Sequence, residues 1–179
     1  MKINLWCGYK VFEWYCNVDC VNGKWVDKVM NLDDYPRDFE SDCADEIYCD
    51  NILEHLDFSK STSEIHRILK KWWKVIIKVP YFSNPWAFFA DHQHFYNFDS
   101  YNKYCRNINP GMDLSEPYFD LVERKITFLY QYKKWISKIL LFIRYLLPII
   151  AYKINPKIYI WLFSYLFPAS ELHFLLKKI

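Results

Sequence analysis

Glycine is the residue that this sequence most clearly lacks. The chain has 3 glycines in 179 residues, whereas an average composition would give roughly 13. Glycine is the usual residue at tight turns and at backbone positions with positive φ. Other residue types must therefore form many of the turns, and the chain holds 8 tryptophans and 21% aromatic residues.

Two short motifs are also missing. No G-x-G-x-x-G follows a predicted strand, which argues against a nicotinamide dehydrogenase. The six cysteines include no Cys-x-x-Cys pair. Cys16 and Cys20 fit no standard zinc spacing, so buried structural thiols are favoured, with a zinc site as the alternative. Because the chain begins directly on a predicted strand without a signal peptide, we expect a cytoplasmic protein in a reducing compartment.

The length and the charge distribution limit the architecture. With 179 residues, the chain suits a single α/β domain with its own core. The net charge is +2, but residues 1–123 hold 13 basic and 20 acidic side chains, while residues 124–179 hold 10 basic and 1 acidic. Basic residues interrupt every long apolar run of the C-terminal part, so no run of about 18 residues could span a membrane. The two parts of the chain are therefore expected to face different partners.

Short apolar runs separated by turn residues recur through the first 130 residues. They predict strands at 2–6, 16–20, 26–31, 45–49, 74–80 and 119–129, a pattern typical of a largely parallel sheet. A helix is predicted over 62–71, with Ser61 and Glu64 as its capping box. Residues 130–168 are predicted to be a basic, aromatic helical insertion before a final strand at 169–179, or a lid over the site.

Three motifs follow one another in the first 56 residues. Leu5-Trp6-Cys7-Gly8 ends the first strand, Asn17-Val18-Asp19 ends the second, and Leu53-Glu54-His55-Leu56 follows the fourth. Their order resembles the cofactor half of class I S-adenosylmethionine-dependent methyltransferases, in particular the small ones with Leu-Gly-Cys-Gly and Leu-Glu-His motifs. The resemblance implies an α/β, Rossmann-like three-layer sandwich. Its mostly parallel seven-stranded sheet would have an antiparallel last strand, here preceded by the helical insertion.

The resemblance also implies S-adenosylmethionine as the cofactor. Asp19 would accept the ribose hydroxyls at the end of the second strand, or it merely caps that strand. Asn31 and Leu32 would lie near adenine, and the residues after the fourth strand near the methionine end. The expected cofactor-binding residues are Leu5, Trp6, Gly8, Asp19, Asn31, Leu32, Cys49, Asp50 and Asn51. For the Glu54-His55 pair, structural support and catalysis both stay open.

Tryptophan stands at four positions where the resembling family has glycine, namely Trp6, Trp14, Trp72 and Trp73. All four are predicted turns, where an indole and a Cβ are unfavourable. One hypothesis explains all four: the source reads UGA as glycine, and the sequence was translated with tryptophan for that codon. UGG at these codons would exclude it. The alternative is a diverged, inactive member whose turns have changed.

Histidines after the fifth strand are the candidate catalytic residues. The loop Asp91-His92-Gln93-His94 falls where the family has its acceptor pocket, and transfer to an oxygen acceptor benefits from a general base. His94 or His92 could be that base, with Asp91 orienting it, or the loop is only a packing element. A metal held by Asp91, His92 and His94 is less favoured because no fourth ligand is apparent, and no metal is expected.

These features predict methyl transfer from S-adenosylmethionine to a small or glycan/lipid-linked acceptor. Residues 124–170 contain eight basic and no acidic side chains, interleaved with aromatic residues, as in segments that contact an anionic membrane surface. Packing on the sheet or on a second subunit is the alternative for these helices, and no nucleic acid is expected. The alternative function is a catalytically inactive, methyltransferase-like binding or scaffold protein.

Overall fold

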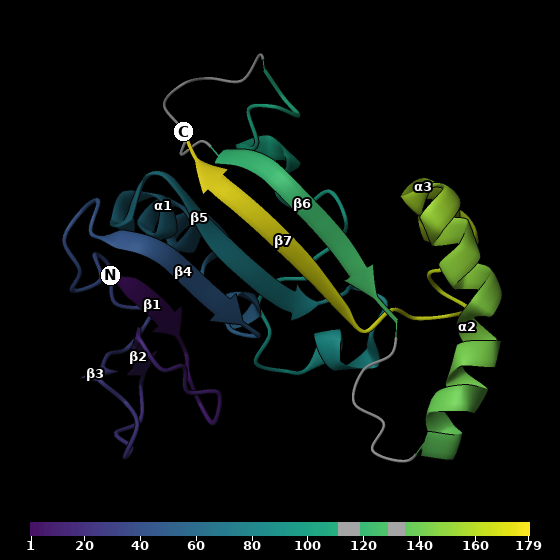
Figure 1. Cartoon of the computed structure of the whole chain (residues 1–179), viewed down its shortest axis with the longest axis horizontal. Helices are drawn as coiled ribbons and strands as arrows, with labels where there is room; N and C mark the ends of the chain where they lie inside the picture. Colours follow the sequence, from purple (N-terminus) through teal and green to yellow (C-terminus); the bar gives the residue numbers. More distant parts are fainter. Residues whose placement is uncertain (111–118, 129–134) are drawn as a thin grey trace.

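A seven-stranded sheet organises the chain (Figure 1). The computed structural model describes residues 1–110, 119–128 and 135–179. The strands are β1 (Lys2–Leu5), β2 (Tyr15–Asp19), β3 (Lys28–Val29), β4 (Ala44–Asp50), β5 (Leu69–Pro80), β6 (Phe119–Thr127) and β7 (Glu171–Lys178). They lie in the order β3-β2-β1-β4-β5-β7-β6, and β7 runs antiparallel to both β5 and β6. The predicted fold class, with its antiparallel last strand and preceding helices, is confirmed.

The central strands bury one face of the sheet almost completely. Ile3, Ile47, Val75 and Leu172 are each 0–1% exposed and lie on four neighbouring strands. Along residues 75–79 and 172–176, buried residues alternate with partly exposed ones, which is the pattern of strands with one face on the core. The strand positions could therefore be predicted, although β5 begins at Leu69, earlier than expected, and β3 is only two residues long.

The strand order changes direction between β1 and β4, which are neighbours in the sheet. After β1 the chain adds β2 and β3 on one side, whereas β4 and β5 lie on the other side. The ends of β1 and β4 are neighbours, with Leu5 paired to Cys49. In open α/β sheets, ligands bind outside the carboxyl ends of the strands at such a switch point. The residues that follow Leu5 and Cys49 are therefore placed at the expected binding edge.

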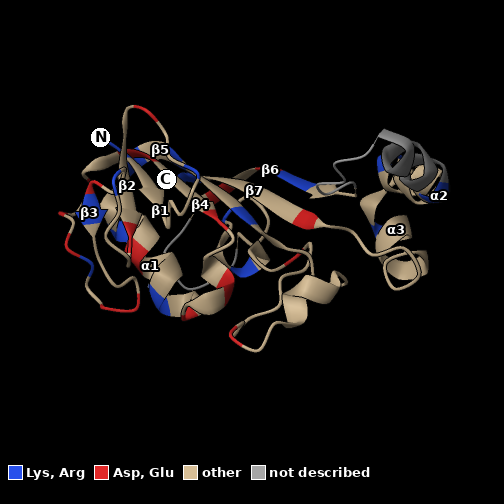
Figure 2. Ribbon diagram, turned by 90° about the horizontal axis from the view of Figure 1, so that it is seen from below, with Lys and Arg blue, Asp and Glu red and all other residues tan. Residues whose placement is uncertain are grey.

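Helix α1 (Phe58–Ile68) packs on one face of the sheet (Figures 1 and 2). Its predicted range of 62–71 and its capping box were wrong. The cap is Asp57, whose side chain accepts a hydrogen bond from the backbone N–H of Lys60. Ser61 and Glu64 lie inside the helix rather than at its start. Their side chains bind the loop before β4, so they are not free to cap the helix.

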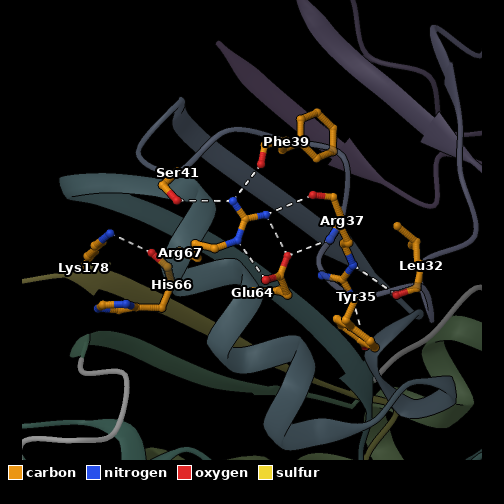
Figure 3. Close-up of polar contacts among 9 residues, drawn as sticks. All are labelled: Leu32, Tyr35, Arg37, Phe39, Ser41, Glu64, His66, Arg67 and Lys178. Atoms are coloured by element: carbon orange, nitrogen blue, oxygen red, sulfur yellow. Dashed lines mark hydrogen bonds and ion pairs between the residues drawn. The ribbon is translucent and has the colours of Figure 1, made fainter.

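That loop is anchored on α1 through Glu64 (Figure 3). The Glu64 carboxylate accepts hydrogen bonds from the backbone N–H of Arg37 at 3.0 Å and from Nε and Nη2 of Arg67 at 2.8 and 2.9 Å. Arg67 also donates to the carbonyls of Phe39 and Arg37. The Arg37 side chain donates to Ser61 Oγ and to the carbonyl of Leu32. These bonds fix the connection between β3 and β4.

Three of the four suspect tryptophans have a backbone that favours glycine. The φ angles are +59° at Trp6, +70° at Trp14 and +71° at Trp72. An L-residue with a side chain pays roughly 1–2 kcal/mol in this left-handed region. Trp72 and Trp73 lie within β5, opposite a register shift in its pairing with β4. Trp73 is not among the residues with positive φ, so the backbone supports glycine at three positions and leaves the fourth as a prediction.

Helices α2 (Trp135–Ile154) and α3 (Pro156–Leu162) connect β6 to β7 and stand beside the sheet (Figure 1). Tyr145 and Tyr159 turn inward and donate hydrogen bonds to the carbonyls of Pro168 and Phe167. Tyr152 accepts a hydrogen bond from the backbone N–H of Ile126. The part of these helices that the structure describes with side chains, residues 144–162, carries basic but no acidic residues (Figure 2). Within the described ranges, no helix is both long and apolar enough to cross a membrane.

Three short 3-10 helices complete the described part of the chain: η1 (Leu53–His55), η2 (Pro85–Phe88) and η3 (Asn102–Tyr104). η1 follows β4, and η2 follows β5. The Asn84 side chain caps η2 by accepting a hydrogen bond from the backbone N–H of Trp86. Both η1 and η2 therefore lie after the carboxyl ends of central strands, where the sheet presents its binding edge.

Candidate site at the carboxyl edge of the sheet

The turn after β1 is built around the buried carboxylate of Asp19. Its Oδ2 accepts a hydrogen bond from the backbone N–H of Gly8 at 2.9 Å, and its Oδ1 accepts one from Val21 at 3.0 Å. The Cys7 thiol lies 3.9 Å from the same Oδ2, and burial together with this negative charge raises the pKa of Cys7. Gly8 has a φ of +47°, which a residue with a side chain rarely adopts. The strand end and the glycine turn are thus one unit.

Asp19 suits a role at a ribose. A carboxylate offers about four lone-pair positions, and the two backbone N–H donors occupy part of that capacity. Asp19 is 7% exposed and lies at the end of β2, beside the β1 turn. On this side, the residues present fit the cofactor that the sequence predicts.

The Asp50 carboxylate at the end of β4 is already engaged. The Lys10 ammonium lies 2.6 Å from its Oδ2, and the Tyr48 hydroxyl donates to the same oxygen at 2.8 Å. The neighbouring Asn51 has a φ of +53° and donates from Nδ2 to Asp50 Oδ1. Sequence reasoning missed the roles of Lys10 and Tyr48, because an ion pair between residues 40 positions apart leaves no local pattern.

The indole of Trp6 projects from the β1 turn to η1, where it stacks on His55. The ring centroids are 6.1 Å apart, and the planes differ by 7°. This side chain is 38% exposed and lies at the switch point between β1 and β4. It therefore lies beside the strand ends, where the resemblance leads us to expect the methionine part of the cofactor, so the residues present fit the cofactor less well here than at Asp19.

A cavity of about 240 Å³ opens beside η1. Its walls come from the ends of β4 and β5, from η1, from the loop containing η2, and from the start of β7. Its lining residues are Asn51, Glu54, His55, Pro80, Asn84, Trp86, Phe89, His92, Ser170 and Glu171. Of the cofactor and catalytic residues predicted from sequence, this cavity brings Asn51 and His92 together. The aromatic walls Trp86 and Phe89 were missed, since exposed aromatics in a loop carry no specific signal.

Glu54, His55 and His92 meet at one wall of the cavity. The imidazole rings of His55 and His92 have centroids 4.5 Å apart at 89°. Burial raises the pKa of Glu54 to about 8, and the nearby carboxylates of Asp50 and Asp91 add to this rise. Burial and the neighbouring His92 lower the pKa of His55. At neutral pH this wall therefore favours a protonated carboxyl and a neutral imidazole.

The predicted catalytic residues separate in the structure. His92 lines the cavity, and Asp91 lies 3.3 Å from Nδ1 of His55 rather than beside His92 or His94. His94 lines a different hollow, and its Nε2 accepts a hydrogen bond from the backbone N–H of Phe58 at 3.2 Å. That nitrogen is therefore already used as an acceptor, and His94 supports the start of α1. Of the three, His92 is best placed to act in the cavity.

The remaining predicted cofactor residues fall into two groups. Leu5, Leu32 and Cys49 are 0–2% exposed and belong to the core, so any contact from them would come through their backbone. Burial raises the pKa of the Cys49 thiol to about 12. Asn31 is exposed, and its side chain bonds to Asp34 and to the backbone N–H of Asp33. Adenine contact by Asn31 and Leu32 stays a prediction.

Comparison with known proteins supports the fold assignment. No protein-family model and no curated protein matches the sequence. A SAM-dependent methyltransferase from Archaeoglobus fulgidus is 16% identical, with a TM-score of 0.57 over 99% of this chain and 85% of that one. A putative methyltransferase from Haloferax volcanii, in complex with the Trm112 methyltransferase activator, is 14% identical, with a TM-score of 0.55 over 99% and 81%.

A third solved structure has the cofactor bound. Phosphoethanolamine N-methyltransferase 2 from Haemonchus contortus, in complex with S-adenosyl-L-methionine, is 13% identical. The TM-score is 0.51 over 90% of this chain and 42% of that one. Identities this low show only the fold. The chain has the fold of SAM-dependent methyltransferases.

Proposed function

We propose that this chain transfers the methyl group of S-adenosylmethionine to a small or glycan/lipid-linked acceptor at a membrane surface. The observation that carries the proposal is the placement of two features at one edge of the sheet. The Gly8–Asp19 turn and the cavity beside η1 both follow the carboxyl ends of the central strands. A cofactor on the turn and an acceptor in the cavity would be neighbours, as transfer requires.

The residues in the cavity suit an acceptor with a hydroxyl group. S-adenosylmethionine, when bound, supplies an electrophilic methyl group on a sulfonium. The His92 Nδ1 faces the carbonyl of Ala87 at 3.1 Å. With its hydrogen donated there, the ring presents Nε2 as a base. That nitrogen would take the proton of an acceptor hydroxyl, and the cofactor, when bound, would supply the methyl group to the oxygen and leave as the neutral thioether.

The membrane part of the proposal rests on the outer surface of α2, α3 and the turn that follows α3. Nine large apolar side chains there are 36–82% exposed: Leu146, Leu147, Ile150, Ile154, Ile158, Trp161, Leu162, Tyr165 and Leu166. We call this set the α2–α3 apolar surface. Arg144, Lys153 and Lys157 are exposed on the same helices. Apolar and aromatic side chains flanked by basic ones suit the headgroup region of an anionic bilayer.

A transfer assay tests the acceptor class. The chain with glycine at position 6 is incubated with methyl-labelled S-adenosylmethionine and a mixture of lipid-linked glycans, and lipid-extractable label is separated from water-soluble label. Label in the lipid fraction that needs the protein supports the proposal. Label found only in water-soluble small molecules would restrict the acceptor to that class and remove the lipid link.

An inactive binding protein is the second candidate, and Trp6 favours it. With its indole stacked on His55, the chain as written has less space for the methionine part of the cofactor. Failure to bind S-adenosylhomocysteine, with binding recovered by glycine at position 6, would assign the inactivity to that side chain.

A further inference from the structure

We infer that Glu54, His55 and His92 form a binding site for one divalent transition-metal ion in the cavity wall. Each side chain offers one ligand atom, and these atoms all lie within 4.8 Å of one another. Among the described residues, they form the one group of three or more histidine, cysteine or acidic side chains with this spacing. Two imidazoles and one carboxylate are a typical ligand set for zinc or iron(II).

An unpartnered oxygen points independently to a missing ligand. Glu54 is 1% exposed, and its Oε2 is buried without a hydrogen-bond partner in the part of the chain that the structure describes. Burying a polar atom without a partner is unfavourable, so such atoms are uncommon unless another group binds them. A cation between Glu54 and the two imidazoles would satisfy this oxygen.

Neighbouring groups hold both histidines in the orientation that a metal needs. His92 Nδ1 lies 3.1 Å from the carbonyl of Ala87, and His55 Nδ1 lies 3.3 Å from Oδ2 of Asp91. A ligating histidine usually donates its second ring N–H to a carbonyl or a carboxylate, which fixes the tautomer. Nε2 of each ring then carries the lone pair for the ion. With the ion bound, His92 Nε2 is no longer free as the general base of the proposed transfer, and a water or hydroxyl on the ion would lose its proton more easily instead.

Three protein ligands leave a coordination position open. Glu54, His55 and His92 all line the cavity, so that position faces the space available to a small molecule. Metal sites with an open position bind water or substrate, whereas structural zinc sites have four protein ligands. The proposed metal site therefore belongs to the class that binds water or an oxygen-containing substrate. All of its ligands are protein side chains, so the ion should bind in the absence of S-adenosylmethionine.

Calorimetric titration of Zn²⁺ into the metal-free full-length chain tests the inference. We expect one equivalent to bind, with affinity reduced about 100-fold in Glu54→Gln and in His92→Gln. Asp91→Asn should lose about tenfold, as is usual for a partner of a ligating histidine. His66→Gln is the matched control, because His66 lies on α1 against Phe119 and outside the group; its affinity should be unchanged.

An NMR measurement on the unsubstituted chain tests the same inference even if the variants fail to fold. With ¹⁵N-labelled histidine, Zn²⁺ should shift the ring nitrogens of His55 and His92 and leave those of His66 in place. Absence of binding would overturn the inference. So would binding that is equal in all variants, or shifts elsewhere only, since the ion would then bind at other residues such as the exposed thiol of Cys20.

Discussion

The indole of Trp6 lies nearly parallel to the imidazole of His55, with ring centroids 6.1 Å apart. This contact joins the β1 turn to η1 across the edge of the sheet where cofactor and acceptor would meet. Trp6 reaches it with a φ of +59°, a backbone conformation that glycine adopts freely. One side chain thus combines backbone strain with a position inside the candidate site.

Replacing Trp14 by glycine should stabilise the fold. Trp14 is 86% exposed at a φ of +70°, so the indole buries little, and relief of the left-handed strain outweighs the added freedom of glycine. We expect a gain of about 1 kcal/mol, measured by thermal or denaturant unfolding. The control is Trp25→Gly, an exposed tryptophan outside the positive-φ set, which should lose stability. Equal effects of both would contradict the account.

The hydrogen bonds of Glu64 should make the free energy of unfolding depend on pH in the acidic range. Although burial opposes it, hydrogen bonding from Arg67 and from the Arg37 backbone lowers the pKa of Glu64 below its ordinary value. Its contribution is therefore complete above the unfolded value of about 4.3 and lost as the pH falls through the folded value. Glu64→Gln should cost about 2 kcal/mol at pH 7 and less at pH 3.

The control for the Glu64 measurement is Glu123→Gln. Glu123 is exposed on β6, so the substitution should leave the stability nearly unchanged at both pH values. A loss in Glu64→Gln of the same size at pH 7 and pH 3 would show that the carboxylate charge contributes nothing.

Binding to anionic vesicles should depend on the α2–α3 apolar surface. Serine at Leu147, Ile154 and Leu166 removes three exposed apolar side chains, and we expect at least tenfold weaker binding at low salt, measured by vesicle sedimentation. A control with serine at Val21, Val29 and Val122, which are exposed elsewhere, should bind as before. No vesicle binding by the unmodified chain would leave a protein partner or a second copy to cover this surface.

Asp19→Asn should weaken S-adenosylhomocysteine binding at least tenfold in a chain with glycine at position 6. The amide keeps one acceptor oxygen but loses the charge that strengthens bonds from Gly8, Val21 and a ribose. Glu123→Gln, exposed on the distant edge strand β6, is the control and should bind normally. Equal affinities for all three proteins would exclude the ribose role of Asp19.

The elements that could be predicted from sequence are those whose signal is local. Buried strands such as β4 appear as short apolar runs, and the Gly8 and Asp19 motifs mark the ends of β1 and β2. The start of α1 could not be predicted, because it depends on a contact between residues far apart in the sequence. Arg37, in the loop before β4, donates a hydrogen bond to Ser61, and Asp57 caps the helix instead. The Lys10–Asp50 ion pair and the meeting of Glu54 with His92 likewise depend on the assembled sheet.

Calorimetric titration of S-adenosylhomocysteine into two proteins tests the central claim most directly. One protein is the chain as written, and the other has glycine at positions 6, 14, 72 and 73. The account predicts binding by the glycine protein, and weaker or no binding by the chain with Trp6. If both proteins are folded and neither binds S-adenosylhomocysteine, the proposal of a methyltransferase site at this edge of the sheet is contradicted.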